Sequence, residues 1–138
     1  MQKLDDSRVV LDFLTGAGRP DDDRPGIDLM LASEGGEALK VIIPVDDLPA
    51  RPAAGERALI TSRLVKAVAH FEQVGGLVLA VRRGGCPAPR GDDLAWHDAF
   101  DAACQEHGVA NLGVYVATRR GAQQVEPLAP QPTPVSGS

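Results

Sequence analysis

The sequence feature that most restricts the fold is an uninterrupted apolar run from Leu77 to Val81. A strand that is apolar at every position, rather than at alternate positions, is typical of a sheet covered on both faces. Helical patterns flank this run, over residues 55–74 before it and residues 92–107 after it. The alternation of helix and strand predicts an α/β domain in which both helices cross over a sheet.

The other elements follow from apolar periodicity and from turn residues. Asp5 or Asp6 can cap a short first helix, and Gly35 and Gly36 are suited to a hairpin turn. In chain order, we expect a helix over 5–15, strands over 27–32 and 39–43, a helix over 55–74, a strand over 77–81, a helix over 92–107, a strand over 109–118 and a short segment over 123–126. The predicted fold is a small mixed sheet of four to five strands, in the order α-β-β-α-β-α-β, with helices packed on it.

Specific side chains are expected to set the boundaries and the buried faces of these elements. Pro44, Pro49 and Pro52 should prevent the second strand from continuing. Asp92 is the expected N-cap of the last helix, and Gly108 should end that helix. The predicted inward stripe of the helix over 55–74 consists of Ile60, Leu64, Val68 and Phe71, with Val65 and Ala67 beside it.

Length and composition indicate one domain over residues 1–126. Residues 127–138 contain four prolines together with Ser and Gly, and they are predicted to form a disordered tail. The first residues lack the apolar segment of a signal peptide, and no stretch approaches 18 apolar residues. We therefore expect a cytoplasmic protein that does not insert into a membrane.

Charge is distributed unevenly along the chain. The net charge is −5. Residues 1–56 hold twelve acidic and six basic residues, whereas residues 57–138 hold seven acidic and eight basic ones. An acidic chain argues against non-specific binding of nucleic acid by the whole surface. The clustered arginines of the second half are therefore the strongest functional signal.

Five of the eleven arginines fall at the ends of two expected strands or in the loop between them. If the strands over 77–81 and 109–118 run parallel, their carboxyl ends lie at one edge, where open α/β sheets usually bind ligands. The candidate binding residues at this edge are Arg82, Arg83, Gly84, Gly85, Arg90, Arg119 and Arg120.

These residues predict a non-enzymatic interaction or assembly module. Its partner would be an acidic protein or a second copy of the chain, docked for example through the acidic residues 1–28. The alternative is a small anionic-ligand or hydrolytic domain that uses the loop over 82–93, where the glycines and a helix N-terminus favour an anion. Asp92 and Asp93 argue against this alternative, because they would repel phosphate at the same helix start.

No catalytic, cofactor or metal residue is assigned from the sequence. Asp93 and His97 share a helix face and lie near Cys86, but a helix-surface Asp–His pair is usually structural. Two cysteines form neither a disulfide framework nor a zinc site. Phosphate-loop and dinucleotide-binding motifs are also absent from the sequence.

Two family resemblances accompany this reading. The segments Phe13–Gly16, Arg19–Asp22 and Val45–Pro49, together with the order of elements over about residues 5–126, resemble the actinobacterial "domain of unknown function 4192" family. That resemblance implies a fold but no activity. The rear half also resembles a JAB-type, RadC-like metalloprotease domain. The zinc-binding histidines of that domain are missing here, which would leave only Asp92 or Asp93 as a ligand and implies that the peptidase chemistry is lost.

Overall fold

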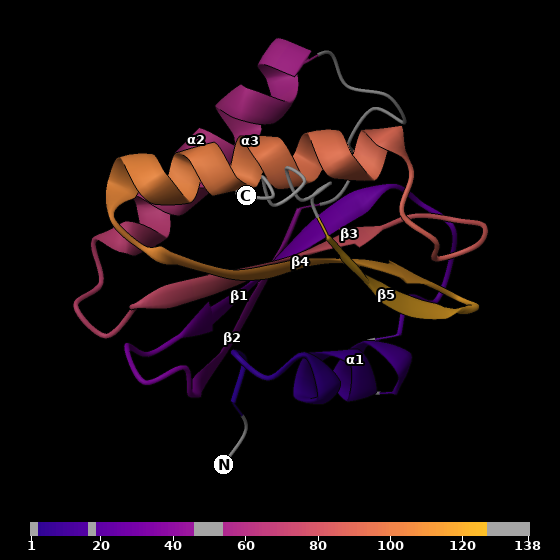
Figure 1. The fold of residues 1–138 in the computed structure, drawn as a ribbon, viewed down its shortest axis with the longest axis horizontal. Helices are drawn as coiled ribbons and strands as arrows, with labels where there is room; N and C mark the ends of the chain where they lie inside the picture. The colour runs from indigo at the N-terminus through magenta and orange to yellow at the C-terminus, as the bar shows by residue number, and fades with distance from the viewer. Residues whose placement is uncertain (1–2, 17–18, 46–53, 127–138) are drawn as a thin grey trace, which may run out of the picture.

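The structure is a computed structural model that describes residues 3–16, 19–45 and 54–126. The described residues form a five-stranded mixed sheet in the order β2-β1-β3-β4-β5, with three helices packed on it (Figure 1). The elements are α1 (Ser7–Thr15), β1 (Gly26–Ala32), β2 (Ala38–Val45), α2 (Ala54–Ala69), β3 (Gly76–Arg82), α3 (Gly91–His107), β4 (Ala110–Thr118) and β5 (Gly121–Val125). The predicted α/β class and the mixed sheet with packed helices are confirmed.

Both directions of strand pairing occur in the sheet. β1 pairs antiparallel with β2 and with β3, so it lies between two strands that run the same way. β3 pairs parallel with β4, and α3 is the crossover between them. β4 then turns back into β5, which pairs antiparallel with it. The short segment expected over 123–126 is therefore part of a fifth strand.

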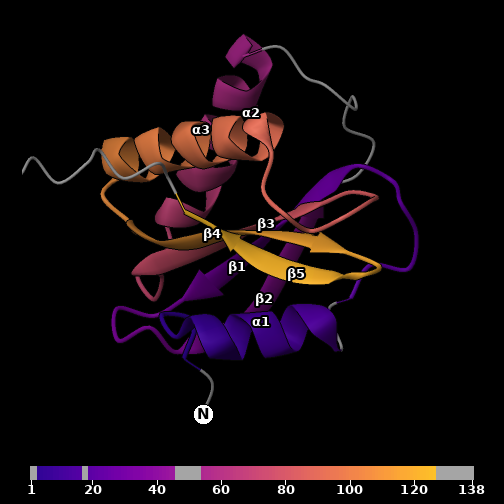
Figure 2. The same cartoon turned by 45° about the vertical axis from the view of Figure 1, so that its right-hand side comes forward.

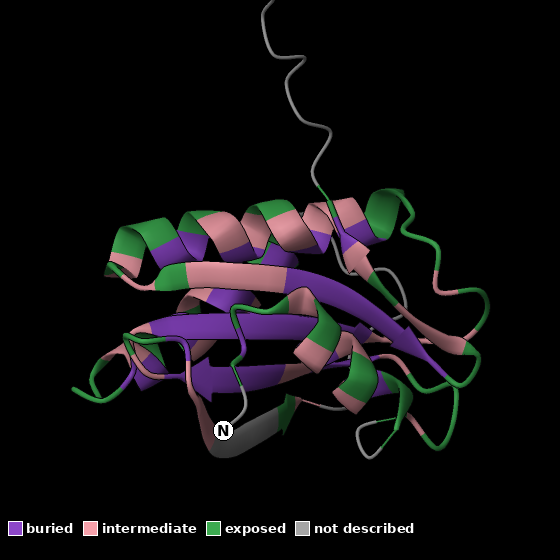
Figure 3. Ribbon diagram, turned by 60° about the horizontal axis from the view of Figure 1, so that its bottom comes forward, coloured by how far each residue is buried: buried purple, intermediate pink, exposed green. Residues whose placement is uncertain are grey.

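The helices form a layer on each face of the sheet. α2 and α3 cover one face, and α1 lies against the other (Figures 1 and 2). The central strands are accordingly the most buried part of the molecule (Figure 3). The apolar run of β3 serves both faces in alternation, since Leu77, Leu79 and Val81 belong to the cluster under α2 and α3, whereas Val78 and Ala80 belong to the cluster on the α1 side.

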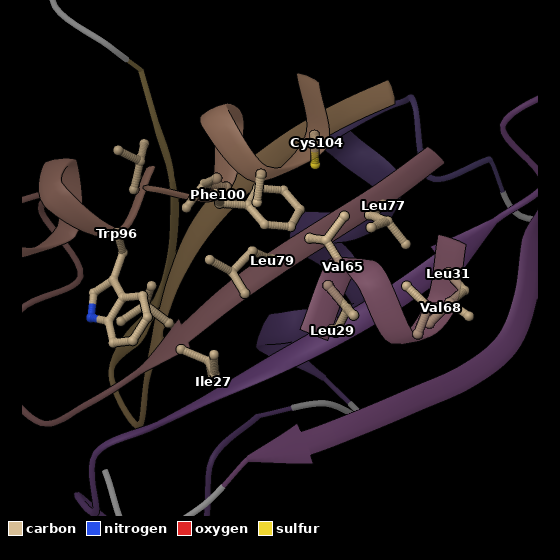
Figure 4. Packing of buried hydrophobic residues seen from close by; sticks show 14 of the residues in the cluster. Ile27, Leu29, Leu31, Val65, Val68, Leu77, Leu79, Trp96, Phe100 and Cys104 are labelled. Atoms are coloured by element: carbon tan, nitrogen blue, oxygen red, sulfur yellow. The ribbon is translucent and has the colours of Figure 1, made fainter. Parts of the chain in front are cut away.

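The larger core cluster joins α2 and α3 to the sheet. Phe100 of α3, Val65 of α2 and Leu79 of β3 are each at most 1% exposed, and they lie close together (Figure 4). Burying an aliphatic or aromatic side chain of this size stabilises a fold by about 1.5–3 kcal/mol. The hydroxyl of Thr61 adds a polar contact, donating to the carbonyl of Ala99 at 3.2 Å and so linking α2 to α3.

The expected inward stripe of α2 is partly wrong. The helix ends at Ala69, not at Val74, and Phe71 beyond it is 56% exposed. Val65, expected beside the stripe, is fully buried, whereas Leu64 is only half-buried. Phe71 lies beyond the end of the helix, so helical spacing no longer places its side chain on the buried face.

The structure shows where Pro44 lies and which of the two expected residues caps α1. Pro44 does not end the strand, because it lies inside β2 opposite Asp28. β2 is an edge strand, where one missing N–H is tolerated. Asp6, one of two expected caps, accepts a hydrogen bond from the Arg8 amide at 2.9 Å. Pro49, Pro52 and the proline-rich segment over 127–138 lie outside the described residues.

Candidate binding site

The two arginine pairs lie at the same edge of the sheet. Because β3 and β4 are parallel, Arg82 lies opposite Ala117, and the turn with Arg119 and Arg120 follows directly. Figure 1 shows the β4–β5 turn at the same end of the sheet as the end of β3. The sequence left open whether these two strands run parallel, and the structure shows that they do. The antiparallel β1 starts at this same edge, since Gly26 pairs with Arg82.

Arg82 is engaged within the protein. Its Nε donates to Asp28 Oδ1 at 3.1 Å, and a terminal nitrogen donates to the Val45 carbonyl at 3.3 Å. The side chain passes so close to Gly26 that a Cβ there would lie 2.5 Å from the guanidinium. Arg82 therefore joins the ends of three strands and is not available to a partner in the way that the sequence suggested.

Arg83 is engaged even more fully. It forms a two-point ion pair with Asp93, with Nε to Oδ1 at 3.1 Å and a terminal nitrogen to Oδ2 at 2.9 Å. The guanidinium also donates to the carbonyls of Gly84, Cys86 and Ala88. The Asp93 side chain is 1% exposed. Arg83 therefore organises the loop after β3 and does not form part of a free basic surface.

The start of α3 differs from the expected one. Arg90, not Asp92, is the N-cap residue, and the Asp93 carboxylate accepts a hydrogen bond from the Arg90 backbone N–H at 2.8 Å. Asp92 instead pairs with Arg57 of α2 at 3.1 Å. The Arg57 guanidinium also lies 5.8 Å from the centre of the Trp96 ring, within the range of a cation–π contact. Both carboxylates that argued against an anion at this helix start are thus matched by an arginine.

Three other arginines surround a polar depression. Arg19, Asp23, Gly85, Arg119 and Arg120 line a hollow of about 400 Å³, which we call the arginine hollow. Arg90 borders it, since a Cβ on Gly85 would lie 2.8 Å from a terminal nitrogen of Arg90. Gly85 has a φ of 87°, a left-handed conformation that favours glycine. The predicted Arg90, Arg119, Arg120 and Gly85 are therefore neighbours around one depression.

The described part of the chain offers these guanidinium groups no internal partner. The ion pairs and side-chain hydrogen bonds of arginine within it involve Arg24, Arg57, Arg82 and Arg83, and not the guanidinium groups of Arg19, Arg90, Arg119 or Arg120. All four residues are exposed.

Arg19 and Asp23 are site residues that the sequence analysis missed. They lie in the loop before β1, far in the sequence from Arg90, Arg119 and Arg120. The antiparallel direction of β1 brings this loop to the carboxyl ends of β3 and β4. Their place in the site follows from the pairing of β1 with β3. The hydrophobic pattern of the sequence does not specify that pairing.

No metal site was found in the part of the chain that the structure describes. Those ranges contain no group of three or more His, Cys, Asp and Glu that could hold an ion. His97 faces Asp98 at 3.2 Å, whereas Asp93 is held by Arg83. Cys86 is exposed. Cys104 is buried, and this burial, together with the nearby Asp101, raises the pKa of its thiol to about 12.

Comparison with protein families and with curated proteins gives no relative from which a function could be transferred. No protein-family model and no curated protein matches this chain. The resemblances to the "domain of unknown function 4192" family and to a RadC-like domain therefore stay predictions. None of the helices in the described ranges is long and apolar enough to cross a lipid bilayer.

Proposed function

We propose that this domain is a non-enzymatic binding module that recognises an acidic protein partner through the arginine hollow and Arg90. The observation that carries the proposal is the contrast between two sets of arginines at one sheet edge. Arg82 and Arg83 form ion pairs within the protein. Within the described ranges, the guanidinium groups without such a pair are those of Arg19, Arg90, Arg119 and Arg120.

The chemistry of the surrounding surface supports binding more than catalysis. Guanidinium groups are permanently charged and bind carboxylate or phosphate oxygens in pairs of parallel hydrogen bonds. They do not act as general acids or bases at neutral pH, because a guanidinium group keeps its proton there. A local basic site on a protein of net charge −5 would also orient an acidic partner as it approaches.

Two acidic residues of the segment 1–28 are not free to dock a second copy at this site. Asp23 belongs to the hollow itself, and Asp22 is paired with Arg24 at 3.1 Å. These carboxylates therefore lie beside the arginines and do not form a remote acidic surface that a second copy could present.

Charge reversal at the turn between β4 and β5 tests this proposal. The double variant Arg119→Glu/Arg120→Glu should weaken binding of an acidic probe, such as a fluorescent oligo-glutamate peptide, by about tenfold or more, since several charge-assisted contacts are lost. Arg63→Glu/Lys66→Glu reverses two exposed basic residues of α2 outside the hollow and changes the net charge by the same amount, so it is the control for a change of charge alone. Fluorescence anisotropy should show weaker binding at high salt for the wild type.

Equal binding by the double variant and by the wild type would contradict the proposal. Loss of binding in Arg63→Glu/Lys66→Glu as well would mean that net charge, rather than the hollow, controls the interaction. Sedimentation analysis of the same proteins tests self-association directly, and we expect no change in oligomeric state on reversal of Arg119 and Arg120.

A further inference from the structure

The geometry points to a phosphate monoester as the group that the arginine hollow binds. This inference rests on the proposed function, because it names the acidic group that the same site accepts. The shared chemistry is a terminal phosphate, whether on a modified protein side chain or on a small molecule.

The charge inside the hollow is the first argument. Arg19, Arg119 and Arg120 contribute three positive charges and Asp23 contributes one negative charge, so the lining carries a net charge of about +2. A carboxylate supplies a single negative charge, whereas a phosphate monoester carries about −1.5 to −2 at pH 7. The dianion therefore balances the lining, and a single carboxylate leaves it positively charged.

The number and kind of donors are the second argument. Each guanidinium presents five N–H donors, and a phosphate monoester offers three terminal oxygens as acceptors. Arg90, whose terminal nitrogen lies above Gly85, adds a fourth guanidinium at the border. No apolar side chain lines the hollow among the described residues, so binding would depend on the charged group and not on the rest of the ligand.

The two carboxylates at the start of α3 are each paired with an arginine, so they do not oppose the binding of phosphate. Asp92 and Asp93 would repel a dianion if they were free. Asp93 is held by two hydrogen bonds from Arg83, and Asp92 is paired with Arg57 at 3.1 Å. The two carboxylates are thereby neutralised before any ligand arrives, and among the described residues Asp23 is the one carboxylate that lines the hollow itself.

Titration of the full chain with matched probes tests the inference. The probes are N-acetyl-O-phosphoserine amide, N-acetyl-glutamate amide and inorganic phosphate, and the readout is the shift of the backbone amide signals of Gly85, Arg119 and Arg120 in NMR spectra. We expect the phosphoserine probe to bind about tenfold or more tightly than the glutamate probe, since more charge-assisted contacts form.

The pH dependence separates a dianion from a carboxylate. Phosphoserine binding should weaken between pH 7.5 and pH 5.5, because the second pKa of the phosphate is about 6. No histidine is found among the lining residues in the described ranges, and arginine stays charged throughout. A pH-independent affinity over this range would overturn the inference.

Variants complete the test. Arg119→Glu/Arg120→Glu should abolish phosphoserine binding, whereas Asp23→Asn should strengthen it several-fold by removing the opposing charge. Arg63→Glu/Lys66→Glu is again the matched control. The gain of affinity in Asp23→Asn keeps the inference testable even if a charge reversal disturbs the fold.

The outcomes distinguish the two proposals. Equal affinity for the phosphoserine and glutamate probes, with loss of both in the double variant, would overturn the phosphate inference and leave the acidic-partner proposal standing. Binding of neither probe would overturn both. Tighter binding of a phosphoserine peptide than of the isolated probe supports a protein source, and equal binding of inorganic phosphate supports a small-molecule source.

Discussion

At the scale of single residues, arginine has two opposite roles in this protein. Arg83 is 14% exposed and gives its donors to Asp93 and to three backbone carbonyls. Arg119 and Arg120 in the neighbouring turn are exposed. Composition alone treats all of these residues as one basic cluster, although only the exposed ones are available to a ligand.

We expect the ion pair between Arg83 and Asp93 to contribute strongly to stability. Asp93→Ala should lower the free energy of unfolding by about 3–5 kcal/mol, because the Arg83 charge would be left buried without its carboxylate. Arg119→Ala should change it by less than about 0.5 kcal/mol, as expected for an exposed side chain. Urea denaturation followed by circular dichroism measures both. Similar small losses for the two variants would mean that Arg83 and Asp93 contribute little to the fold.

The two cysteines should differ in reactivity. The pKa of the Cys104 thiol is raised to about 12, because burial disfavours the thiolate and Asp101 adds to the effect. Iodoacetamide at pH 8 should therefore label the exposed Cys86 in the folded protein and label Cys104 only after denaturation, as mass spectrometry can establish. Rapid labelling of both thiols in the folded protein would contradict this.

The same shift predicts a loss of stability in alkali. The unfolded thiol has an ordinary pKa of 9.0, so it releases its proton at lower pH than the folded one. The contribution is complete below about pH 9 and declines as the pH rises toward about 12. Cys104→Ala should show a shallower decline than the wild type when urea midpoints are compared across this range.

At the scale of elements, β3 shows how a continuous apolar strand is used. Leu79 faces α2 and α3, whereas Val78 faces the α1 side, and both are fully buried. The run itself predicted that both faces are covered. It did not specify which helix covers which face, since that depends on how the crossovers lie over the sheet.

Core substitutions should follow this arrangement. Leu79→Ala should cost about 2–5 kcal/mol, because it leaves a cavity beneath two helices. Phe71→Ala, although it removes a larger side chain, should stay within about 0.5 kcal/mol of wild type because Phe71 is exposed. Thermal unfolding of both variants measures the contrast. A large loss in Phe71→Ala would mean that α2 extends beyond Ala69 in solution.

Tertiary contacts override the local sequence pattern at the end of α2 and at the start of α3. Helical periodicity located α2 but not its end, so Phe71 was placed on the buried face. N-cap preference favoured Asp92, yet Asp93 is drawn inward by Arg83 and Arg90 becomes the cap. Strand ends and arginine clusters could be predicted from the sequence, whereas the partners that neutralise Arg82 and Arg83 depend on packing.

At the scale of the whole molecule, the described fold closes with β5. Val125 is the last buried residue of that strand, and it packs in the cluster beneath α3. Residues 127–138 carry few apolar side chains to bury. A truncation after Glu126 should therefore leave the Tm within about 2 °C of the full chain, since little stabilising burial is lost. A fall of several degrees, measured by calorimetry, would show that the tail contributes to the fold.

The antiparallel placement of β1 has a consequence for the biogenesis of the site. Arg19 and Asp23 enter the hollow from the beginning of the described chain, Gly85 from its middle, and Arg119 and Arg120 from near its end. A nascent chain that still lacks β4 has only one of the three arginines that line the hollow, Arg19, and so has no complete hollow. Under the proposed function, ligand binding would require that β4 and the turn after it have been synthesised, and a bound ligand would stabilise the fold only once all three segments are in place.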